Sequence, residues 1–381
     1  MIVVVYGTTA ELIKLAPVLR RLKDRQAPLL TLCTGQHVEQ IPALLDDLEL
    51  PHPYIWLGRG NDGRDLERKR NLPVWLVQVA KAFARARGNL LEQFASDSTS
   101  PLLLVHGDTM TTVLGALMGR LMRVPVAHVE AGIRSGDWRN PFPEELDRIA
   151  AARLARIHYA PGPHAAANLR SMNARGEIVD TGGNTIRDAL EMVPAVAHGI
   201  DLPKEPFGIV SLHRSELLGN RSAFAAILEE LRTASRRTLL VFIDHPVTAA
   251  AIKAHRLESL FDERFRRIPR QRYFRFIALQ QASVFVVTDS GGSQEECARV
   301  GHPCLVHRAV TERPDGLDGG SVVLSRMSLD VVREFLENPS AHQTAPAEDR
   351  VHPSDAIIRH LELRGYLRPP SVAQRPTALA G

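Results

Sequence analysis

Cysteine, lysine and long apolar runs are all scarce in this sequence, and each scarcity excludes a class of protein. Only 3 of the 381 residues are cysteine, and no two of them are spaced Cys-x-x-Cys. A sparse, odd-numbered set argues against a disulfide framework or a zinc cluster and favours a reducing compartment. No apolar stretch approaches the roughly 18 residues of a membrane-spanning helix, and the N-terminus lacks the basic region of a signal peptide. We therefore expect a cytoplasmic protein without a metal site.

The net charge is also small: 47 basic and 43 acidic side chains give +4 at neutral pH. This near balance argues against a polybasic nucleic-acid binder. Only six of the basic residues are lysine. Arginine suits phosphate and carboxylate because its planar fork donates two parallel hydrogen bonds. A codon bias of the source genome explains the preference at least as well.

Short apolar strands followed by helical runs recur along the chain. Residues 2–6 (IVVVY) are apolar without alternation and precede the helical run ELIKLAPVLRRLK. Such strands are typical of a parallel sheet that is covered on both faces. Further strands of this kind are expected at 29–33, 101–108, 124–130, 207–213, 239–245, 283–289 and 303–308. The predicted fold class is α/β, with two Rossmann-like doubly wound domains.

A helix and a Pro- and Gly-containing linker near residues 184–200 suggest where the two domains meet. We predict an N-terminal domain over residues 1–184 and a C-terminal domain over residues 185–366. The second domain would end with a helix that has a Ser/Asp start, near residues 354–366. The Pro- and Ala-rich tail over residues 367–381 is predicted to be disordered.

Ligands of open α/β sheets bind beyond the carboxyl ends of the strands, so polar residues at those ends are the candidate site. Carboxylates, histidines and small residues alternate there, as a charged, oxygen-rich ligand would require. They are Gly7-Thr8-Thr9, Gln36-His37, His106, Asp108, Glu130, His213-Arg214, Asp244-His245 and Asp289-Ser290-Gly291-Gly292.

The segment Asp289-Ser290-Gly291-Gly292-Ser293-Gln294-Glu295-Glu296 carries the clearest single signal. Small residues at a helix start let backbone N–H groups reach a phosphate, which the helix dipole favours. A glutamate one turn later can accept both hydroxyls of a ribose. The residues Ser290-Gly291-Gly292 are also typical of an ordinary turn with a serine N-cap. Because the two glutamates follow, we favour a nucleotide site.

Three acids in the first half are candidate catalysts. Buried carboxylates at strand ends are costly unless they are paired or used. Asp108 could instead cap the next helix, whereas Glu130 has no such structural role. Glu144 begins a helix whose dipole favours an acid, and Arg148, four residues later, could pair with it.

Basic groups complete the candidate set. His213 and Arg214 follow a strand and suit an anion contact or a general acid, and Arg313 is a second candidate arginine. Lys14 stands on the first helix, where a single lysine is usually solvated.

Over roughly residues 1–325 the sequence resembles the non-hydrolysing UDP-N-acetylglucosamine 2-epimerases, because it has a series of short motifs in the order expected for that family. The resemblance rests on Gly7-Thr8…Glu11…Lys14, Gly35-Gln36-His37, His106-Gly107-Asp108-Thr109, His128-Val129-Glu130-Ala131-Gly132-Ile133-Arg134, Pro143-Glu144-Glu145…Arg148, Thr181-Gly182-Gly183-Asn184-Thr185, His213-Arg214…Glu216, Thr288-Asp289-Ser290-Gly291-Gly292…Glu296 and Thr311-Glu312-Arg313-Pro314. It implies the glycosyltransferase-B (GT-B) architecture, with the active site in the cleft between two Rossmann-like domains. Thr9-Ala10 stand where that family usually has Arg-Pro, and Val38 and Glu39 also depart from its pattern.

The resemblance implies interconversion of UDP-GlcNAc and UDP-ManNAc by elimination of UDP to 2-acetamidoglucal and re-addition, without a cofactor. It implies catalytic roles for Asp108, Glu130, Glu144 and His213. Substrate contacts would come from Lys14, Arg148, Arg214, Gln271, Phe276, Ser290, Gly291, Gly292, Glu296 and Arg313, although Phe276 also suits a core position. Gln36, His37 and His245 match positions that would hold an activating UDP-sugar.

Three alternatives remain from the sequence. A hydrolysing epimerase would release ManNAc and UDP, a GT-B glycosyltransferase would not need the three acids together, and a non-catalytic binder would tolerate their loss. We expect a UDP-sugar or a modified UDP-HexNAc as the ligand and a homodimer as the assembly. We expect neither nucleic acid nor membrane as a partner.

Overall fold

The computed structural model describes residues 1–61, 63–66, 69–137, 139, 141–192, 202–311, 316–318, 320–346 and 352–368. These residues form two compact units. The first unit comprises Met1–Glu191 together with the C-terminal segment Arg350–Gly381, and the second comprises Met192–Asp349.

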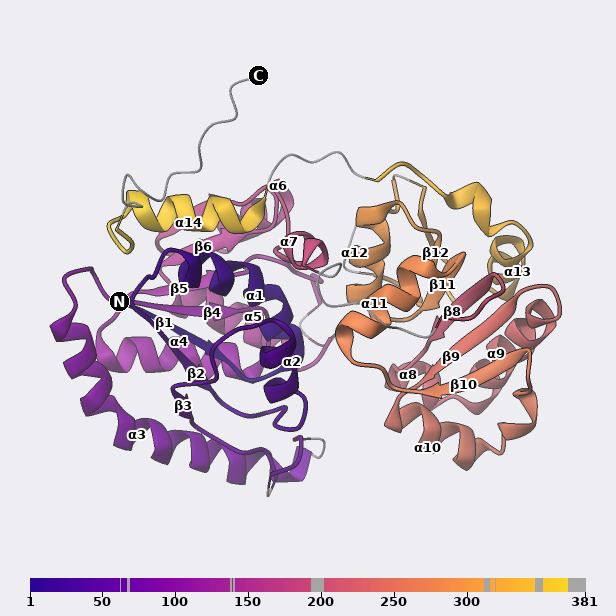
Figure 1. The fold of residues 1–381 in the computed structure, drawn as a ribbon, viewed down its shortest axis with the longest axis horizontal. Coiled ribbons are helices and arrows are strands. Elements are labelled where there is room, and N and C mark those ends of the chain that lie inside the picture. The colour runs from indigo at the N-terminus through magenta and orange to yellow at the C-terminus, as the bar shows by residue number, and fades with distance from the viewer. Residues whose placement is uncertain are drawn as a thin grey trace. The chain divides into compact units, whose positions relative to one another are not determined.

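A parallel sheet with the strand order β3-β2-β1-β4-β5-β6-β7 forms the centre of the first unit (Figure 1). Every residue of β1 and of β4 is buried, which explains why these strands are apolar without alternation. The strands are β1 (Ile2–Tyr6), β2 (Leu29–Cys33), β3 (Ile55–Trp56), β4 (Leu102–His106), β5 (Val126–Val129), β6 (Ile157–Ala160) and β7 (Glu177–Asp180). Its helices are α1 (Thr9–Asp24), α2 (Ile41–Asp47), α3 (Leu72–Ser96), α4 (Met110–Met122), α5 (Glu144–Leu154), α6 (Pro163–Ser171), α7 (Ile186–Glu191) and α14 (Pro353–Leu363).

The helix starts of the first unit follow from local sequence. Thr8 caps α1 in a reciprocal capping box with Glu11, which satisfies two N–H groups that a helix start leaves open. A proline near its first turn begins α3. The buried face of α3 includes Trp75, Val79 and Phe83, which recur every four residues as an amphipathic helix requires.

The second unit repeats this architecture with the strand order β10-β9-β8-β11-β12-β13, again all parallel. Its strands are β8 (Phe207–Ser211), β9 (Leu239–Asp244), β10 (Phe265–Pro269), β11 (Phe285–Thr288), β12 (Cys304–Val306) and β13 (Val322–Leu324). Its helices are α8 (Ser215–Leu218), α9 (Arg221–Ser235), α10 (Pro246–His255), α11 (Tyr273–Ala282), α12 (Gly291–Val300) and α13 (Leu329–Glu337).

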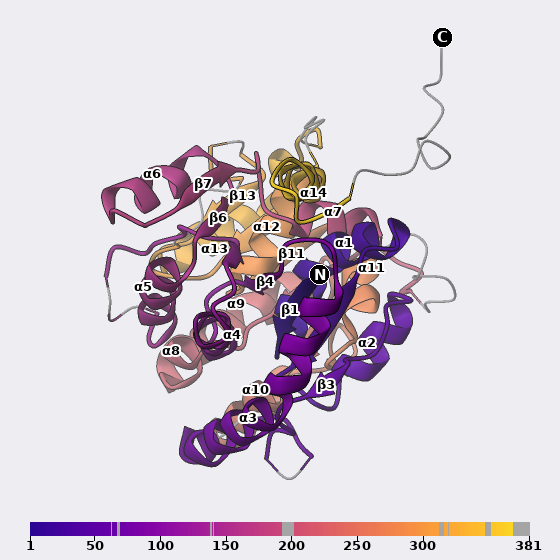
Figure 2. The ribbon, with the colours of Figure 1, turned by 90° about the vertical axis from the view of Figure 1, so that its left-hand side faces the viewer.

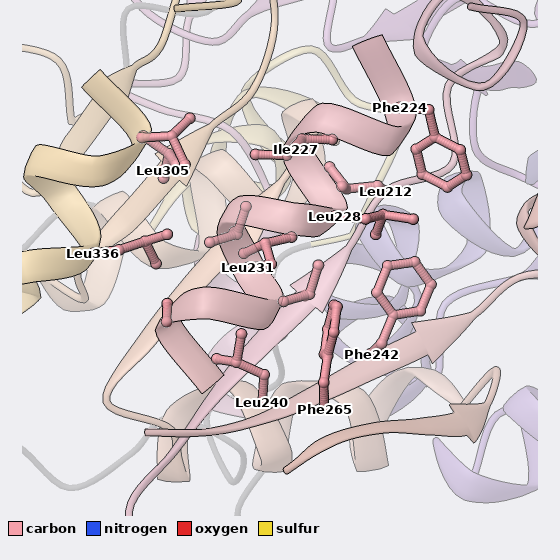
Figure 3. Close-up of a cluster of buried hydrophobic side chains, with 14 of the residues drawn as sticks. Leu212, Phe224, Ile227, Leu228, Leu231, Leu240, Phe242, Phe265, Leu305 and Leu336 are labelled. Atoms are coloured by element: carbon pink, nitrogen blue, oxygen red, sulfur yellow. The ribbon is translucent and has the colours of Figure 1, made fainter. Parts of the chain in front are cut away.

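Figure 3 shows how α9 packs its apolar face onto the second sheet. Phe224, Ile227, Leu228 and Leu231 lie on one side of α9, because they are separated by three or four residues. They pack against buried strand residues that include Phe242. This side of the sheet is therefore covered by α9 together with α13, whose Val332, Phe335 and Leu336 belong to the same cluster.

The C-terminal helix α14 packs on the first unit, against α1 and α7 (Figure 2). Arg25 and Glu362 form an ion pair of 3.1 Å. Asp188 accepts a hydrogen bond of 2.7 Å from the backbone N–H of Ser354. This division differs from the predicted one, because α7 and α14 both pack with the first unit instead of following the boundary at residue 184. Of the tail predicted to be disordered, residues 369–381 lie outside the described residues.

The predicted fold class, two Rossmann-like doubly wound domains, is confirmed by the two parallel sheets. The sequence reading overlooked α3, although α3 is the longest helix of the first unit. It also overlooked the short strands β3, β10 and β13, which lie at sheet edges. Edge strands need not be apolar on both faces, so they give a weaker sequence signal.

Truncation of a core residue of α9 tests the packing of the second unit. Leu228→Ala is expected to lower the free energy of unfolding by roughly 2–5 kcal/mol, because it removes buried atoms and leaves a cavity. Urea unfolding measures the change. Glu229→Ala on the exposed side of the same helix is the control, and a similar effect of both substitutions would contradict the packing.

Candidate active site

The strand order of the first unit reverses between β1 and β4, so the loops that follow these two strands lie side by side. Glu11 joins the two loops. Its Oε2 accepts hydrogen bonds from the backbone N–H groups of Gly7 (2.8 Å) and Thr8 (2.9 Å), and its Oε1 accepts one from the Thr109 hydroxyl (2.5 Å). Burial raises the pKa of the Glu11 carboxyl, and these hydrogen bonds oppose the increase. Glu11 therefore sets the shape of the strand-end site.

Glu130 lies directly after β5 in a left-handed backbone conformation, with φ 65°. A non-glycine residue in this region is strained by roughly 1–3 kcal/mol, and such strain clusters at functional sites. Lys14 donates a hydrogen bond of 2.7 Å to Oε2 of Glu130. His106 Nε2 lies 3.2 Å from the same oxygen. Lys14 is thus part of the site, and the interpretation of it as a solvated residue is wrong.

Asp108 and Arg148 form the second charged contact of this site. Both Nε (2.9 Å) and Nη2 (2.6 Å) of Arg148 donate to Oδ2 of Asp108. Nη1 of Arg148 donates to Glu145 at 3.2 Å, and Glu145 also pairs with Arg134. The predicted pair between Glu144 and Arg148 is therefore wrong. Arg148 instead connects the carboxyl end of β4 to the buried side of α5.

The carboxyl of Asp108 does not cap α4, because the Thr109 side chain caps that helix instead. Oδ1 of Asp108 accepts no hydrogen bond and forms no ion pair with any described residue. The side chain of Asp108 is 32% exposed. One oxygen is thus held in place by Arg148, while the other can reach a ligand.

Glu144 and Asp147, together with Glu145, are the acidic residues in the first turn of α5. Oε2 of Glu144 is buried without a hydrogen-bond partner among the described residues. Burial, together with the charges of Asp108 and Glu144, raises the pKa of Asp147 to about 7. Asp147 was not among the predicted site residues. Its position three residues after Glu144, on the same helix face, was the sequence signal that could have identified it.

His128 lies next to this site as a neutral group. Burial lowers the pKa of His128 to about 4. Nε2 of His128 and the carbonyl oxygen of Gly107 are 2.7 Å apart, so the neutral ring donates from Nε2. His128 therefore fixes the loop after β4.

In the second unit the strand order reverses between β8 and β11. Asp289, which follows β11, accepts hydrogen bonds from the backbone N–H groups of His213 (2.9 Å) and Arg214 (2.8 Å). Nε of Arg214 in turn donates to the Asp289 carbonyl at 2.9 Å. Asp289 thus holds the loop after β8 much as Glu11 holds the loops of the first unit.

His213 and His245 lie side by side, with ring centroids 4.6 Å apart. Burial is the main reason that the pKa of His213 is lowered, and nearby Arg214 and Arg270 add to the effect while Asp289 opposes it. Burial also lowers the pKa of His245 to about 3. Both rings are therefore neutral at physiological pH and act as hydrogen-bonding groups rather than cations.

Helix α12 begins at Gly291, and no side chain caps its start. The interpretation of Ser290 as an ordinary side-chain N-cap is therefore wrong. A helix start without a side-chain cap keeps N–H donors for an anion. One turn later Glu296 is buried, and the buried Tyr273 hydroxyl lies beside it. Burial and the Glu296 charge raise the pKa of Tyr273, so this phenol stays protonated.

The remaining predicted residues are placed as follows. The side-chain amide of Gln271 donates to the Pro269 carbonyl, and Phe276 packs at the edge of a core cluster. Nδ1 of His37 lies 3.2 Å from the backbone nitrogen of Thr9, and the Gln36 carbonyl accepts a hydrogen bond from Leu66. Arg313 lies outside the described residues.

Among the described residues one group has the ligand types of a metal site, namely Asp188, Glu191 and His352. Asp188 already accepts hydrogen bonds from Ser354 and contacts His352 at 3.0 Å. This group therefore has a structural role in holding α14. No helix in the described ranges is both long and apolar enough to cross a bilayer.

The two sheets and their strand-end sites define a two-domain α/β protein of the GT-B architecture. The model of the UDP-N-acetylglucosamine 2-epimerase family matches residues 20–353. A UDP-N-acetylglucosamine 2-epimerase of Yersinia pestis is 32% identical over 370 residues, which are 91% of this chain and 94% of the relative. The enzyme of that name from Bacillus subtilis (strain 168) is 31% identical over 362 residues, which are 90% of this chain and 88% of the relative.

Among solved structures, the UDP-GlcNAc 2-epimerase of Neisseria meningitidis bound to UDP-GlcNAc is 26% identical, with a TM-score of 0.77. That match covers 95% of this chain and 99% of the other. The chain belongs to the UDP-N-acetylglucosamine 2-epimerase family.

Replacement of the residue that joins the β1 and β4 loops tests this description of the site. Glu11→Gln is expected to lower the free energy of unfolding by about 1–3 kcal/mol, because an amide cannot accept all the hydrogen bonds of the buried carboxylate. Thermal or urea unfolding measures it. Glu92→Gln on the exposed side of α3 is the matched control, and equal stability of the two variants would contradict the role of Glu11.

Proposed function

We propose that this protein is a UDP-N-acetylglucosamine 2-epimerase, which interconverts UDP-GlcNAc and UDP-ManNAc by eliminating and re-adding UDP. The observation that carries the proposal is the presence of Asp108 and Glu130 at the strand ends, and of Glu144 at the start of α5, in a chain that belongs to this family. A 2-epimerase needs one group that removes the C2 proton and another that returns it to the opposite face. A set of separately held carboxyls meets that need.

The reaction requires the loss of a C2 proton that is not acidified by a neighbouring carbonyl group. Departure of the diphosphate must therefore accompany its removal, which gives 2-acetamidoglucal and UDP. The Lys14 ammonium beside Glu130 favours the ionised form of that carboxyl, which is the form that accepts a proton. Arg148 orients Asp108. The negative charge of these acids also stabilises the electron-poor sugar ring of the transition state.

The second unit supplies the groups suited to UDP. The backbone N–H groups of Ser290, Gly291 and Gly292 would receive a phosphate, and Glu296 would accept the ribose hydroxyls. His213 and Arg214 would contact the diphosphate as the leaving group. Because the His213 ring is neutral, it would donate a hydrogen bond and contribute no full positive charge.

Several finer assignments rest on the family alone and belong to the same proposal. Gln271, Phe276 and Arg313 would complete the uridine and phosphate contacts. An activating UDP-sugar would contact Gln36, His37 and His245. The assembly would be a cytoplasmic homodimer.

The substrate and outcome are tested by incubating the full chain with UDP-GlcNAc in deuterated water and following it by NMR. Deuterium at C2 with UDP still attached supports the 2-epimerase. Release of free ManNAc and UDP would favour a hydrolysing epimerase, and transfer of the sugar to an added acceptor would favour a glycosyltransferase. UDP binding without exchange or turnover would contradict all three for this substrate.

Removal of the Glu130 carboxylate tests its role directly. Glu130→Gln is expected to slow C2 exchange by roughly 100-fold or more, because an amide cannot accept the proton. Its affinity for UDP should stay within a few fold of the wild type, as measured by calorimetry. Glu92→Gln serves as the control, and full exchange activity in Glu130→Gln would show that another group handles the proton.

A methyl group at the start of α12 tests the phosphate contact. A Cβ at Gly292 would meet no atom closer than the Ser290 hydroxyl at 3.7 Å, so Gly292→Ala should fold normally. It should weaken UDP binding by about tenfold, because the phosphate must approach the backbone closely. Gly88→Ala on α3, where nothing lies within 4 Å, is the control. Unchanged UDP affinity in Gly292→Ala would place the phosphate elsewhere.

A further inference from the structure

His106, the last residue of β4, is a buried histidine whose ring makes no hydrogen bond with any described residue. Both Nδ1 and Nε2 are buried without such a partner. Two other buried histidines of this sheet differ, because Nε2 of His128 and Nε2 of His158 lie 2.7 and 3.1 Å from backbone carbonyl oxygens. A buried polar group without a partner is costly. His106 therefore needs an explanation other than its contribution to stability.

The sheet fixes the backbone of His106 beside that of Glu130. In the register of β4 and β5, His106 pairs with Val129, the residue before Glu130. The backbone N–H of Gly107 donates to the Val129 carbonyl at 3.0 Å, and the Thr112 hydroxyl donates to the His106 carbonyl at 2.6 Å. Strand pairing thus brings the His106 ring and the Glu130 carboxyl together on a rigid element, which positions a side chain more precisely than a loop does.

The His106 ring lies against the same carboxylate oxygen that Lys14 contacts. Nε2 of His106 is 3.2 Å from Oε2 of Glu130, and Nζ of Lys14 donates to that oxygen at 2.7 Å. The separation of Nε2 and Oε2 suits a hydrogen bond, but the two groups are not aligned for one. Catalytic hydrogen bonds are often aligned only in the substrate complex. Because a carboxylate only accepts, such a bond requires the proton on Nε2.

Glu130 needs a second donor if it is to act as a base with a fixed direction. A group that removes a proton from carbon must face it within a narrow range of distance and angle. Lys14 supplies charge, but its flexible stem and its three rotatable donors do not fix the plane of the carboxylate. A donor on the same oxygen from the rigid end of β4 would fix that plane. His106 is placed to be this donor.

Resting on the function proposed above, we propose that His106 is a positioning residue for Glu130. Its Nε2–H donates to Oε2 of Glu130 when the UDP-sugar binds, and together with Lys14 it turns that carboxyl toward C2 of the sugar. The ring contacts Glu130 rather than the substrate, so it acts through Glu130 and is not itself the base. The donor that makes no hydrogen bond within the described residues is used in the substrate complex.

Stability separates this role from a structural one. His106→Leu removes no hydrogen bond to a described residue, so its melting temperature should stay within about 3 °C of the wild type. His158→Leu is the matched control, because it removes a hydrogen-bonded imidazole from the neighbouring β6. It should lower the melting temperature more than His106→Leu does and leave kcat within about twofold. A merely structural role of His106 would give the opposite pattern.

The kinetics of UDP-GlcNAc epimerisation test the positioning itself. His106→Leu should lower kcat by about tenfold or more and leave KM within about threefold, because it misplaces a reacting group without removing a substrate contact. Its UDP affinity, measured by calorimetry, should also stay within about threefold. His106→Gln keeps an N–H donor that can reach the position of Nε2, so it should recover kcat to within about threefold of the wild type.

A double-mutant cycle tests whether His106 acts through Glu130. For independent residues, the tenfold loss in His106→Leu and the 100-fold loss in Glu130→Gln would multiply to about 1,000-fold. We expect instead that the double variant exchanges C2 within about threefold of Glu130→Gln alone, because no carboxylate is left to position. Multiplying losses, or an unchanged kcat in His106→Leu, would overturn the role of His106.

The wild type keeps this test distinct from the test of the proposed function. If the wild type exchanges C2 of UDP-GlcNAc and His106→Leu keeps its kcat, only the role of His106 fails. If the wild type does not exchange C2, the proposed function fails, and the positioning role fails with it.

Discussion

In each unit a buried carboxylate joins the two loops where the strand order reverses. Glu11 accepts hydrogen bonds from the loop after β1 and from Thr109 after β4. Asp289, after β11, accepts backbone hydrogen bonds from the loop after β8. A carboxylate suits this position because it is acceptor-only and can receive several donors at once. The remaining polar groups of both strand-end sites depend on loops that these two acids hold.

The first unit brings several ion pairs together at its strand ends and at the start of α5. Arg148 bridges Asp108 and Glu145, and Lys14 pairs with Glu130. Such an arrangement would be poor if its purpose were stability, because buried ion pairs seldom repay their desolvation. It is well suited to chemistry in which neighbouring acids must be in opposite protonation states. The strained backbone of Glu130 agrees with a site that is shaped for function.

The fold was predictable because parallel strands that are buried on both faces leave continuous apolar runs, as in residues 2–6. The strand-end residues followed from the rule that ligands bind at the carboxyl ends of such strands. Partner choice was not predictable, because Arg148 could pair with any acid within reach. Spacing along α5 suggested Glu144, whereas Arg148 contacts Asp108, a residue that is 40 positions away in sequence. Asp147 was overlooked for a similar reason, since its burial depends on how α5 packs.

In the proposed reaction, carboxyl groups of the first unit remove the C2 proton while the bond between C1 and the diphosphate oxygen breaks. Positional isotope exchange tests this most directly, with UDP-GlcNAc that carries ¹⁸O only in the oxygen bridging C1 and phosphorus. The label should move into non-bridging positions of that phosphate during epimerisation, because UDP leaves, its terminal phosphate rotates, and UDP returns. If epimerisation instead leaves all of the label in the bridge, UDP does not leave as a group whose phosphate rotates before it returns, which contradicts the proposed elimination and re-addition.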